Sequence, residues 1–191
     1  MKLLVNGLFL AACLAAAHSS TAGPDKPESF SPLVKKQFGD SFKVTTSMAA
    51  AVITADFDGD GVEDVAIVAD SKDPLPDSFD FKYNVADPYN AFFGFGDPRH
   101  TAGFGRLDPK RNHDVLVIFG AGEDAWRAEA PKAKFVLINV PFDTVEVGRM
   151  LVKKNKPPIF VIRATEAELM DSLVFWDVKK KRWRWQPGDT M

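Results

Sequence analysis

The sequence is poor in the residues on which most covalent and catalytic chemistry depends. Only one cysteine, Cys13, and three histidines occur among its 191 residues. Cys13 lies in the N-terminal apolar stretch, so a mature chain cleaved after it would contain no disulfide. Such a chain depends for its stability on its hydrophobic core, which a metal ion could supplement. With 46% hydrophobic and 12% aromatic residues, the chain has enough apolar material for the core of one domain.

Several functional signatures are also missing. The chain has no Gly-x-Ser-x-Gly sequence, no zinc spacing such as His-Glu-x-x-His, and no glycine-rich phosphate loop. A formal net charge of -2 argues against general nucleic-acid binding. The catalytic candidates that remain are His100 and His113, because a histidine beside an acid such as Asp114 could act as a general base. Histidines in a loop beside basic residues are more often structural, which makes catalysis the weaker interpretation.

The N-terminal residues 1–22 predict a secretory signal peptide. Lys2 supplies a short positive region, an apolar stretch follows from Leu3 to Ala17, and small residues then offer cleavage sites. The apolar stretch is too short to predict a membrane span, so no transmembrane segment is expected after cleavage. We expect export to the periplasm or the medium, with residues 23–30 as a linker. A competing interpretation is a bacterial lipobox ending in Cys13, which would make the protein a lipoprotein.

The most informative stretch is a run of nine residues that holds five acidic side chains and no basic one: Asp56-Phe57-Asp58-Gly59-Asp60-Gly61-Val62-Glu63-Asp64. Carboxylates this close repel one another, and a bound cation relieves the repulsion. The alternate acids at positions 56, 58 and 60 match the first three ligands of a loop around one ion, and the glycine at 61 permits its sharp turn. The Val62 carbonyl and the Asp64 carboxylate complete the predicted ligand set. Because every donor is an oxygen, Ca²⁺ is expected rather than zinc or copper.

The flanking residues indicate which kind of calcium loop this is. An EF-hand would need a glutamate at the twelfth position, where Ile67 stands. Both flanks, Met48 to Ala55 and Val65 to Ala69, are short apolar runs typical of strands. The stretch from Ile53 to Ala66 resembles the FG-GAP/VCBS repeat of integrin-type β-propellers, which carries Asp-x-Asp-Gly-Asp-Gly-x-x-Asp between two strands. The resemblance implies a strand, calcium loop, strand hairpin, although Asp- and Gly-rich turns also occur without metal.

The rest of the chain predicts a single α+β domain over residues 31–191, built mainly of antiparallel β-sheet. Only one copy of the acidic motif is present, and a propeller needs at least four blades, so a complete propeller is not expected. A short helix is predicted over residues 31–38, with Ser31 as its N-cap and Gly39 after its end. The expected strands are Phe42–Thr46, Met48–Ala55, Val65–Ala69, Val115–Phe119, Phe135–Val140, Thr144–Val152, Ile159–Arg163, Leu173–Val178 and Arg182–Gln186.

Residues 71–114 predict a long loop rich in proline, glycine and aromatic residues. Its prolines and glycines interrupt any helical or strand periodicity. Its many aromatic residues are nevertheless unusual for a disordered linker. We interpret it as a loop that packs on its own aromatics, with a binding surface as the first alternative and disorder as the second. Because long loops in compact domains are often functional, a recognition surface is expected here if the protein has one. The candidate binding residues are Phe92, Phe93, Phe95, Trp183 and Trp185. For the two tryptophans the alternative is the buried face of a hairpin, since Arg182 and Arg184 alternate with them.

Two functional hypotheses follow from these patterns. The first is a non-catalytic exported domain that Ca²⁺ stabilises and that binds an envelope or extracellular partner. The second is a calcium-dependent hydrolase that uses His113 or His100. The C-terminal stretch from Leu173 to Asp189 also resembles the closing hairpin of small exported bacterial proteins that carry one such acidic loop.

Overall fold

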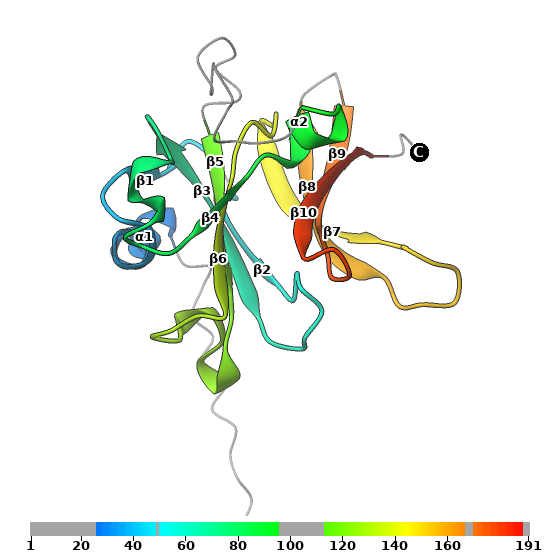
Figure 1. The fold of residues 1–191 in the computed structure, drawn as a ribbon, viewed down its shortest axis with the longest axis horizontal. Coiled ribbons are helices and arrows are strands. Elements are labelled where there is room, and N and C mark those ends of the chain that lie inside the picture. The colour runs from blue at the N-terminus through cyan, green and yellow to red at the C-terminus, as the bar shows by residue number, and fades with distance from the viewer. Residues whose placement is uncertain (1–25, 49, 96–112, 167–169, 189–191) are drawn as a thin grey trace, which may run out of the picture.

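The computed structural model describes residues 26–48, 50–95, 113–166 and 170–188. This part of the chain forms two β-sheets with short helices at their edges and on one face (Figure 1), which confirms the α+β class and the mainly antiparallel pairing. The predicted signal peptide, Cys13 and His100 lie outside the described residues. Among the helices of the described part, none is long and apolar enough to cross a membrane.

The first sheet contains six strands in the order β1-β3-β5-β6-β4, and β2 pairs with the same edge of β3 as β1 does. All of its pairs are antiparallel except that between β4 and β6. Its strands are β1 (Phe42–Val44), β2 (Val52–Ala55), β3 (Asp64–Ser71), β4 (Asn84–Ala86), β5 (His113–Phe119) and β6 (Ala133–Leu137).

The second sheet is an antiparallel meander of four strands in the order β10-β9-β8-β7. Its strands are β7 (Thr144–Met150), β8 (Ile159–Glu166), β9 (Met170–Asp177) and β10 (Arg182–Pro187). β9 and β10 form the hairpin that the sequence predicts across residues 179–181, with Arg182 opposite Asp177. One face of this sheet packs on the first sheet, as the alternation of β10 predicts.

The central strands of the first sheet bury both of their faces, because the sheet is covered on each side. In β3, Val65 and Ile67 contribute to one hydrophobic cluster while Ala66 and Val68 contribute to the other. Side chains alternate between the faces of a strand, so a strand covered on both faces reads as an unbroken apolar run. This explains why the interiors of the two strands, residues 65–69 of β3 and 115–119 of β5, contain no polar residue, whereas their ends do.

A helical layer covers the outer face of the first sheet. It consists of η1 (Pro27–Phe30), a 3₁₀ helix, and α1 (Ser31–Phe38), which buries Val34 and Phe38. The predicted N-cap is wrong: Phe30 occupies the cap position and no side chain caps the helix. Phe30 is buried and its ring lies 5.5 Å from that of Trp126. The linker predicted for residues 23–30 therefore ends before η1, because Phe30 belongs to the core.

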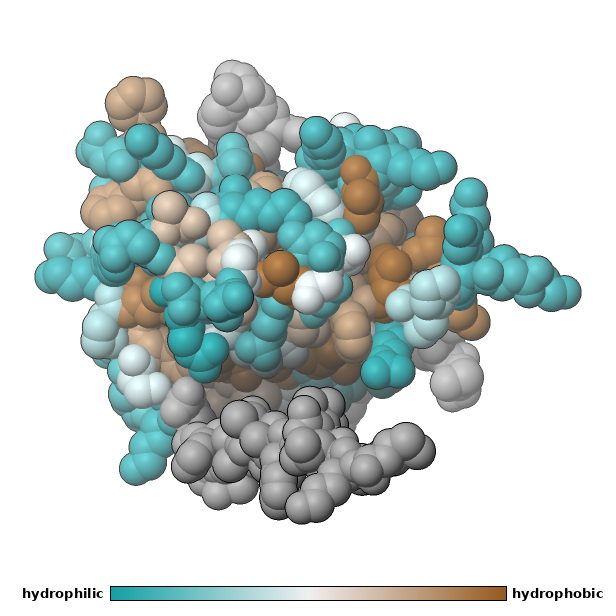
Figure 2. Space-filling model, turned by 90° about the horizontal axis from the view of Figure 1, so that it is seen from below, coloured by the Kyte–Doolittle hydropathy of each residue, from teal (hydrophilic) through white to brown (hydrophobic). Residues whose placement is uncertain are grey.

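The predicted loop at 71–114 contains regular structure that the sequence reasoning missed. It forms η2 (Pro76–Ser78), β4 and the short helix α2 (Pro88–Phe92), which packs on β10. The Asp87 carboxylate caps α2 by accepting from the Asn90 amide at 2.9 Å. A further 3₁₀ segment, η5 (Gly122–Arg127), carries the buried Trp126. On the face seen from below, apolar residues are interspersed with charged and polar ones (Figure 2).

Candidate metal site

The acidic loop connects two paired strands of the first sheet. Ala55 and Asp64 are opposite each other in the antiparallel β2–β3 pair, so residues 56–63 form the connection between them. This confirms the predicted strand, acidic loop, strand arrangement. Gly61 has a φ of 88°, a left-handed conformation that side chains other than glycine adopt only at a cost. The glycine is therefore required by the backbone of the turn, as the sequence predicts.

Three of the predicted ligands converge in the structure. Asp56, Asp58 and Asp64 each offer a carboxylate oxygen, and these three oxygens lie within 4.8 Å of one another. Asp58 and Asp64 are buried and Asp56 is half-buried. Asp60 lies outside this group, and the Val62 amide donates to its carboxylate at 2.8 Å. The three convergent carboxylates could hold one hard cation such as Ca²⁺.

Backbone amides hold two of the three carboxylates by several hydrogen bonds, whereas Asp58 accepts only one such bond, from the Asp60 amide at 3.2 Å. The Asp56 carboxylate accepts from the amides of Gly59, Asp60 and Gly61 at 2.7, 3.0 and 2.8 Å. The Asp64 carboxylate accepts from Phe57 and from Gly120, both at 2.8 Å. Both side chains are therefore oriented before any ion binds, which lowers the conformational cost of binding.

Burial raises the pKa of Asp64 to about 7, and the nearby charge of Asp58 adds to the effect. The hydrogen bonds from the Gly120 and Phe57 amides act in the opposite direction, because they stabilise the ionised carboxylate. A cation in the loop would favour the charged form of Asp64, so proton and cation compete for this side chain near neutral pH.

Lys132 belongs to the site but was missed by the sequence reasoning. Its ammonium Nζ lies 2.6 Å from Asp58 Oδ2 and 2.6 Å from Asp60 Oδ2. The hydrogen bond from Lys132 lowers the pKa of Asp60, while both carboxylates raise the pKa of Lys132. Lys132 follows Asp58 by 74 residues, so no local pattern could reveal it. Only the pairing of β6 with β5, whose end adjoins the loop, brings it there.

The candidate catalytic histidine lies far from the acidic loop. His113 Nδ1 is 2.5 Å from Asp70 Oδ1, and these residues are opposite each other in the β3–β5 pair. Asp70 stands six residues along β3 from Asp64, which corresponds to about 20 Å of extended strand. Asp114, the acid that the sequence pairs with His113, is buried and accepts instead from the Ser71 hydroxyl at 2.5 Å.

The predicted aromatic binding residues fall into two groups. Phe92, Phe93 and Phe95 lie on α2 and just after it, and all three are exposed, Phe95 by 70%. Trp183 and Trp185 are buried instead, the latter with 2% of its surface exposed. The assignment of these two tryptophans to an exposed binding surface is corrected, because β10 directs them into the core between the sheets.

Comparisons with known proteins add no relative to this description: no family model matches the chain, and neither the curated proteins nor the solved structures give a match.

Proposed function

We propose that the loop from Asp56 to Asp64 binds Ca²⁺ and that the ion stabilises an exported, non-catalytic binding domain. The observation that carries this proposal is the convergence of the Asp56, Asp58 and Asp64 carboxylates within 4.8 Å. The loop joins β2 to β3, and β3 contributes to the cores on both faces of its sheet. An ion held here therefore restrains a strand on which the whole domain depends.

The size of the stabilisation follows from mass action. An ion that binds only the native chain stabilises it by about 2.7 kcal/mol when its free concentration is 100-fold above the dissociation constant. For a domain of this size, that free energy corresponds to a rise in melting temperature of roughly 5–10 °C. Free calcium is about millimolar in extracellular settings, where even modest-affinity sites of this type bind the ion.

The proposal is tested by thermal unfolding in Ca²⁺ and in EDTA. We expect a higher melting temperature in Ca²⁺ for the natural chain and little difference between the two conditions for Asp56→Asn. Asp124→Asn, which changes an exposed acid on η5, is the control and keeps the full calcium effect. Comparing conditions within each variant separates ion binding from any direct effect of the substitution. Equal melting temperatures of the natural chain in both conditions contradict the proposal.

A substitution of Lys132 provides a second test of Ca²⁺ binding by the loop. Its ammonium occupies the Asp58 and Asp60 carboxylates, so Ca²⁺ must displace it from Asp58. Lys132→Met removes the competing charge while keeping an unbranched side chain. We expect about tenfold tighter Ca²⁺ binding by calorimetry in this variant, equivalent to about 1.4 kcal/mol. Weaker binding would instead make Lys132 a support of the site.

The partner of the domain is proposed to be an envelope or extracellular component that contacts Phe92, Phe93 and Phe95. The exposure of these three neighbouring rings supports this assignment, since exposed aromatic groups are enriched at binding surfaces. Co-sedimentation of the purified protein with cell-envelope fractions measures the interaction.

The alternative, a calcium-dependent hydrolase acting through His113, has less support from the geometry. His113 and the acidic loop lie at opposite ends of the β3–β5 pair, so one substrate bond cannot reach both. His100 lies outside the described residues.

A further inference from the structure

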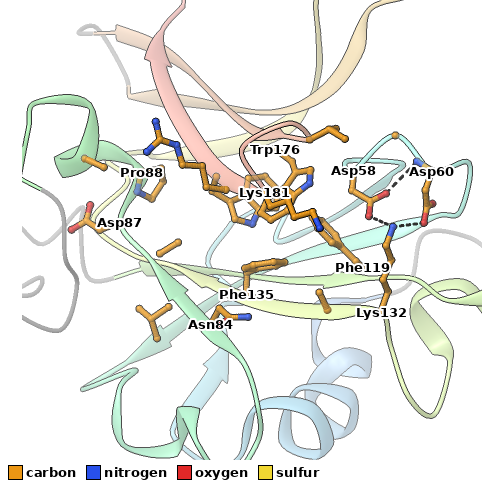
Figure 3. Close-up of a pocket in the computed structure, with 18 residues that line it drawn as sticks. Asp58, Asp60, Asn84, Asp87, Pro88, Phe119, Lys132, Phe135, Trp176 and Lys181 are labelled. Carbon is orange, nitrogen blue, oxygen red and sulfur yellow. Dashed lines mark hydrogen bonds and ion pairs between the residues drawn. The ribbon is translucent and has the colours of Figure 1, made fainter.

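A cleft of about 860 Å³ lies between the two sheets. One wall comes from β4, β5 and β6, and the other comes from the β9–β10 hairpin. The start of α2 and residues 58–60 of the acidic loop also line the cleft. Figure 3 shows Lys181 and Trp176 facing Phe135 and Asn84 across this space. Small-molecule sites in proteins typically enclose about 300–1,000 Å³ and are lined mainly by apolar groups with a few polar ones. The cleft has the size for an organic ligand.

The floor of the cleft is aromatic. The rings of Phe119, Phe135, Trp176 and Trp183 are in mutual contact, with centroids between 5.0 and 6.0 Å apart. Three of them are buried, whereas Trp176 is half-buried and so presents ring surface to the cleft. Trp183 Nε1 is also buried and has no hydrogen-bond partner among the described residues. The aromatic floor of the cleft therefore favours a flat or apolar ligand body.

The charged groups of the cleft differ in whether they are already paired. Its three acids are occupied: Asp58 and Asp60 bind Lys132, and Asp87 accepts from Asn139 at 2.6 Å and from Asn90 at 2.7 Å. Lys181 and Arg182 also line the cleft, and neither has an ion-pair partner within the part of the chain that the structure describes. The charge left to interact with a ligand is positive.

We propose that the cleft binds a small organic anion with a flat hydrophobic body. The body packs against Trp176, and the anionic group, a carboxylate, sulfonate or phosphate, binds to Lys181 and Arg182. The planar guanidinium of Arg182 matches the geometry of such oxyanions. A neutral polar ligand fits less well, because the acids that could accept its hydrogen bonds are engaged. Residues 58–60 of the acidic loop also line this cleft, but the residues assigned to the ligand, Trp176, Lys181 and Arg182, lie outside that loop.

The test uses two fluorescent probes of nearly the same shape. Anilinonaphthalene sulfonate is an aromatic anion, and N-phenylnaphthylamine is its neutral analogue. Titrations are performed in EDTA, so that the result does not depend on whether the loop binds Ca²⁺. We expect one molecule of the sulfonate to bind per chain, about tenfold more tightly than the neutral probe, since a charge-assisted contact contributes of this order.

Two matched double variants in the β9–β10 turn show where the anionic group of the ligand binds. Lys181→Glu with Arg182→Glu reverses the two cleft cations, and we expect it to reduce sulfonate affinity by about tenfold or more without weakening the neutral probe. Lys179→Glu with Lys180→Glu changes the net charge by the same amount in the same turn, but these residues do not line the cleft. This control is expected to retain most of the affinity.

A third variant tests the aromatic wall. Trp176→Leu is expected to weaken both probes, with far-ultraviolet circular dichroism and a cooperative thermal transition showing that the fold is retained. The proposal is overturned if both charge-reversal pairs weaken the sulfonate equally, because the attraction would then be general. Equal affinity of the natural chain for the two probes, or unchanged binding in folded Trp176→Leu, would also overturn it.

Discussion

At the scale of the residue, Asp64 and Asp114 are two buried carboxylates near the starts of the central strands β3 and β5. They differ in the groups that compensate their charge. Asp64 accepts from backbone amides on two sides of the loop. Asp114 accepts from the Ser71 hydroxyl, and its Oδ1 has no partner among the described residues. Burial raises the pKa of Asp114 to about 7. Ionised Asp114 is therefore a buried charge with little compensation, which costs stability.

This difference predicts how stability depends on pH. In the unfolded chain Asp114 has a pKa of about 3.9, below its folded value, so the folded chain binds the proton more tightly. The contribution of Asp114 to stability is present below pH 4 and is lost as the pH rises towards 7. Asp114→Asn keeps an acceptor for Ser71 and cannot ionise. We expect its stability relative to the natural chain to increase by on the order of 1–3 kcal/mol between pH 5 and pH 8.

Urea unfolding at the two pH values measures this effect. Other titrating groups cancel when the variant is compared with the natural chain at the same pH. Asp124→Asn, which removes an exposed charge, should differ little from the natural chain at either pH. A stability difference for Asp114→Asn that is the same at pH 5 and pH 8 would show that Asp114 is not protonated at the lower pH.

The candidate metal residues show how far single-residue prediction reaches. The spacing of Asp56, Asp58 and Asp64 was sufficient to predict their convergence, because the loop closes over nine residues and the flanking strands are adjacent. Asp60 satisfies the same spacing but lies outside the convergent group, and Lys132 pairs with both Asp58 and Asp60. That pairing depends on β6 lying beside β5, and a sequence pattern within one loop contains no information about it.

At the scale of the element, most strands were predictable because their apolar runs are bounded by turn residues. The predicted hairpins and the two central strands are confirmed with small shifts of their ends. β4 and α2 were missed, because β4 is held by its parallel pairing with β6 and α2 by the Asp87 cap. Both elements are short and depend on tertiary contacts, so their intrinsic periodicity is weak.

One glycine connects the end of β5 to the acidic loop. A Cβ atom at Gly120 would lie 2.4 Å from the Glu63 carbonyl oxygen and 2.8 Å from the Ala125 carbonyl carbon. The Gly120 amide also donates to Asp64 at 2.8 Å. Gly120→Ala must displace backbone on one side or the other. We expect it to destabilise the domain by about 1–3 kcal/mol and to weaken Ca²⁺ binding, because Asp64 loses its position.

Denaturant unfolding and calcium calorimetry measure the two effects of Gly120→Ala. The comparison variant is Gly122→Ala, where a Cβ meets no atom within 4 Å but the φ of 61° is unfavourable for alanine. It should lower stability through backbone strain and leave Ca²⁺ affinity unchanged. If both variants weakened the affinity equally, the close approach at Gly120 would not be what positions Asp64.

At the scale of the whole molecule, a helical layer and the second sheet cover opposite faces of the first sheet (Figure 1). The sequence predicted a sheet-rich domain but not its division into two sheets. Every strand of the second sheet and most of the first pair in the same antiparallel way, so local patterns do not distinguish membership. The division depends on pairings between segments far apart in the sequence, such as β3 with β5 and β4 with β6.

The arrangement leaves the aromatic group on α2 accessible beside β10 (Figure 1), and this surface can be tested separately from the core. Phe95→Ser changes a residue that is 70% exposed, and Phe79→Ser changes one that is 88% exposed on another segment. Both should alter stability by less than about 0.5 kcal/mol. We expect only Phe95→Ser to reduce co-sedimentation with envelope fractions. An equal reduction by both variants would indicate general hydrophobic adsorption.

The double burial of the central strands also determines what aligns them with one another. Where one face of a sheet is exposed to solvent, a register shift of one residue exposes the apolar side chains of the strand and is strongly disfavoured. Both faces of β3 and β5 are buried. A shift of one residue would therefore keep most of their apolar side chains buried. The contacts that forbid it are at the two extremities, between Asp70 and His113 and between Asp64 and Gly120. These polar residues thus fix the register of β3 and β5, which their apolar interior residues alone would not specify.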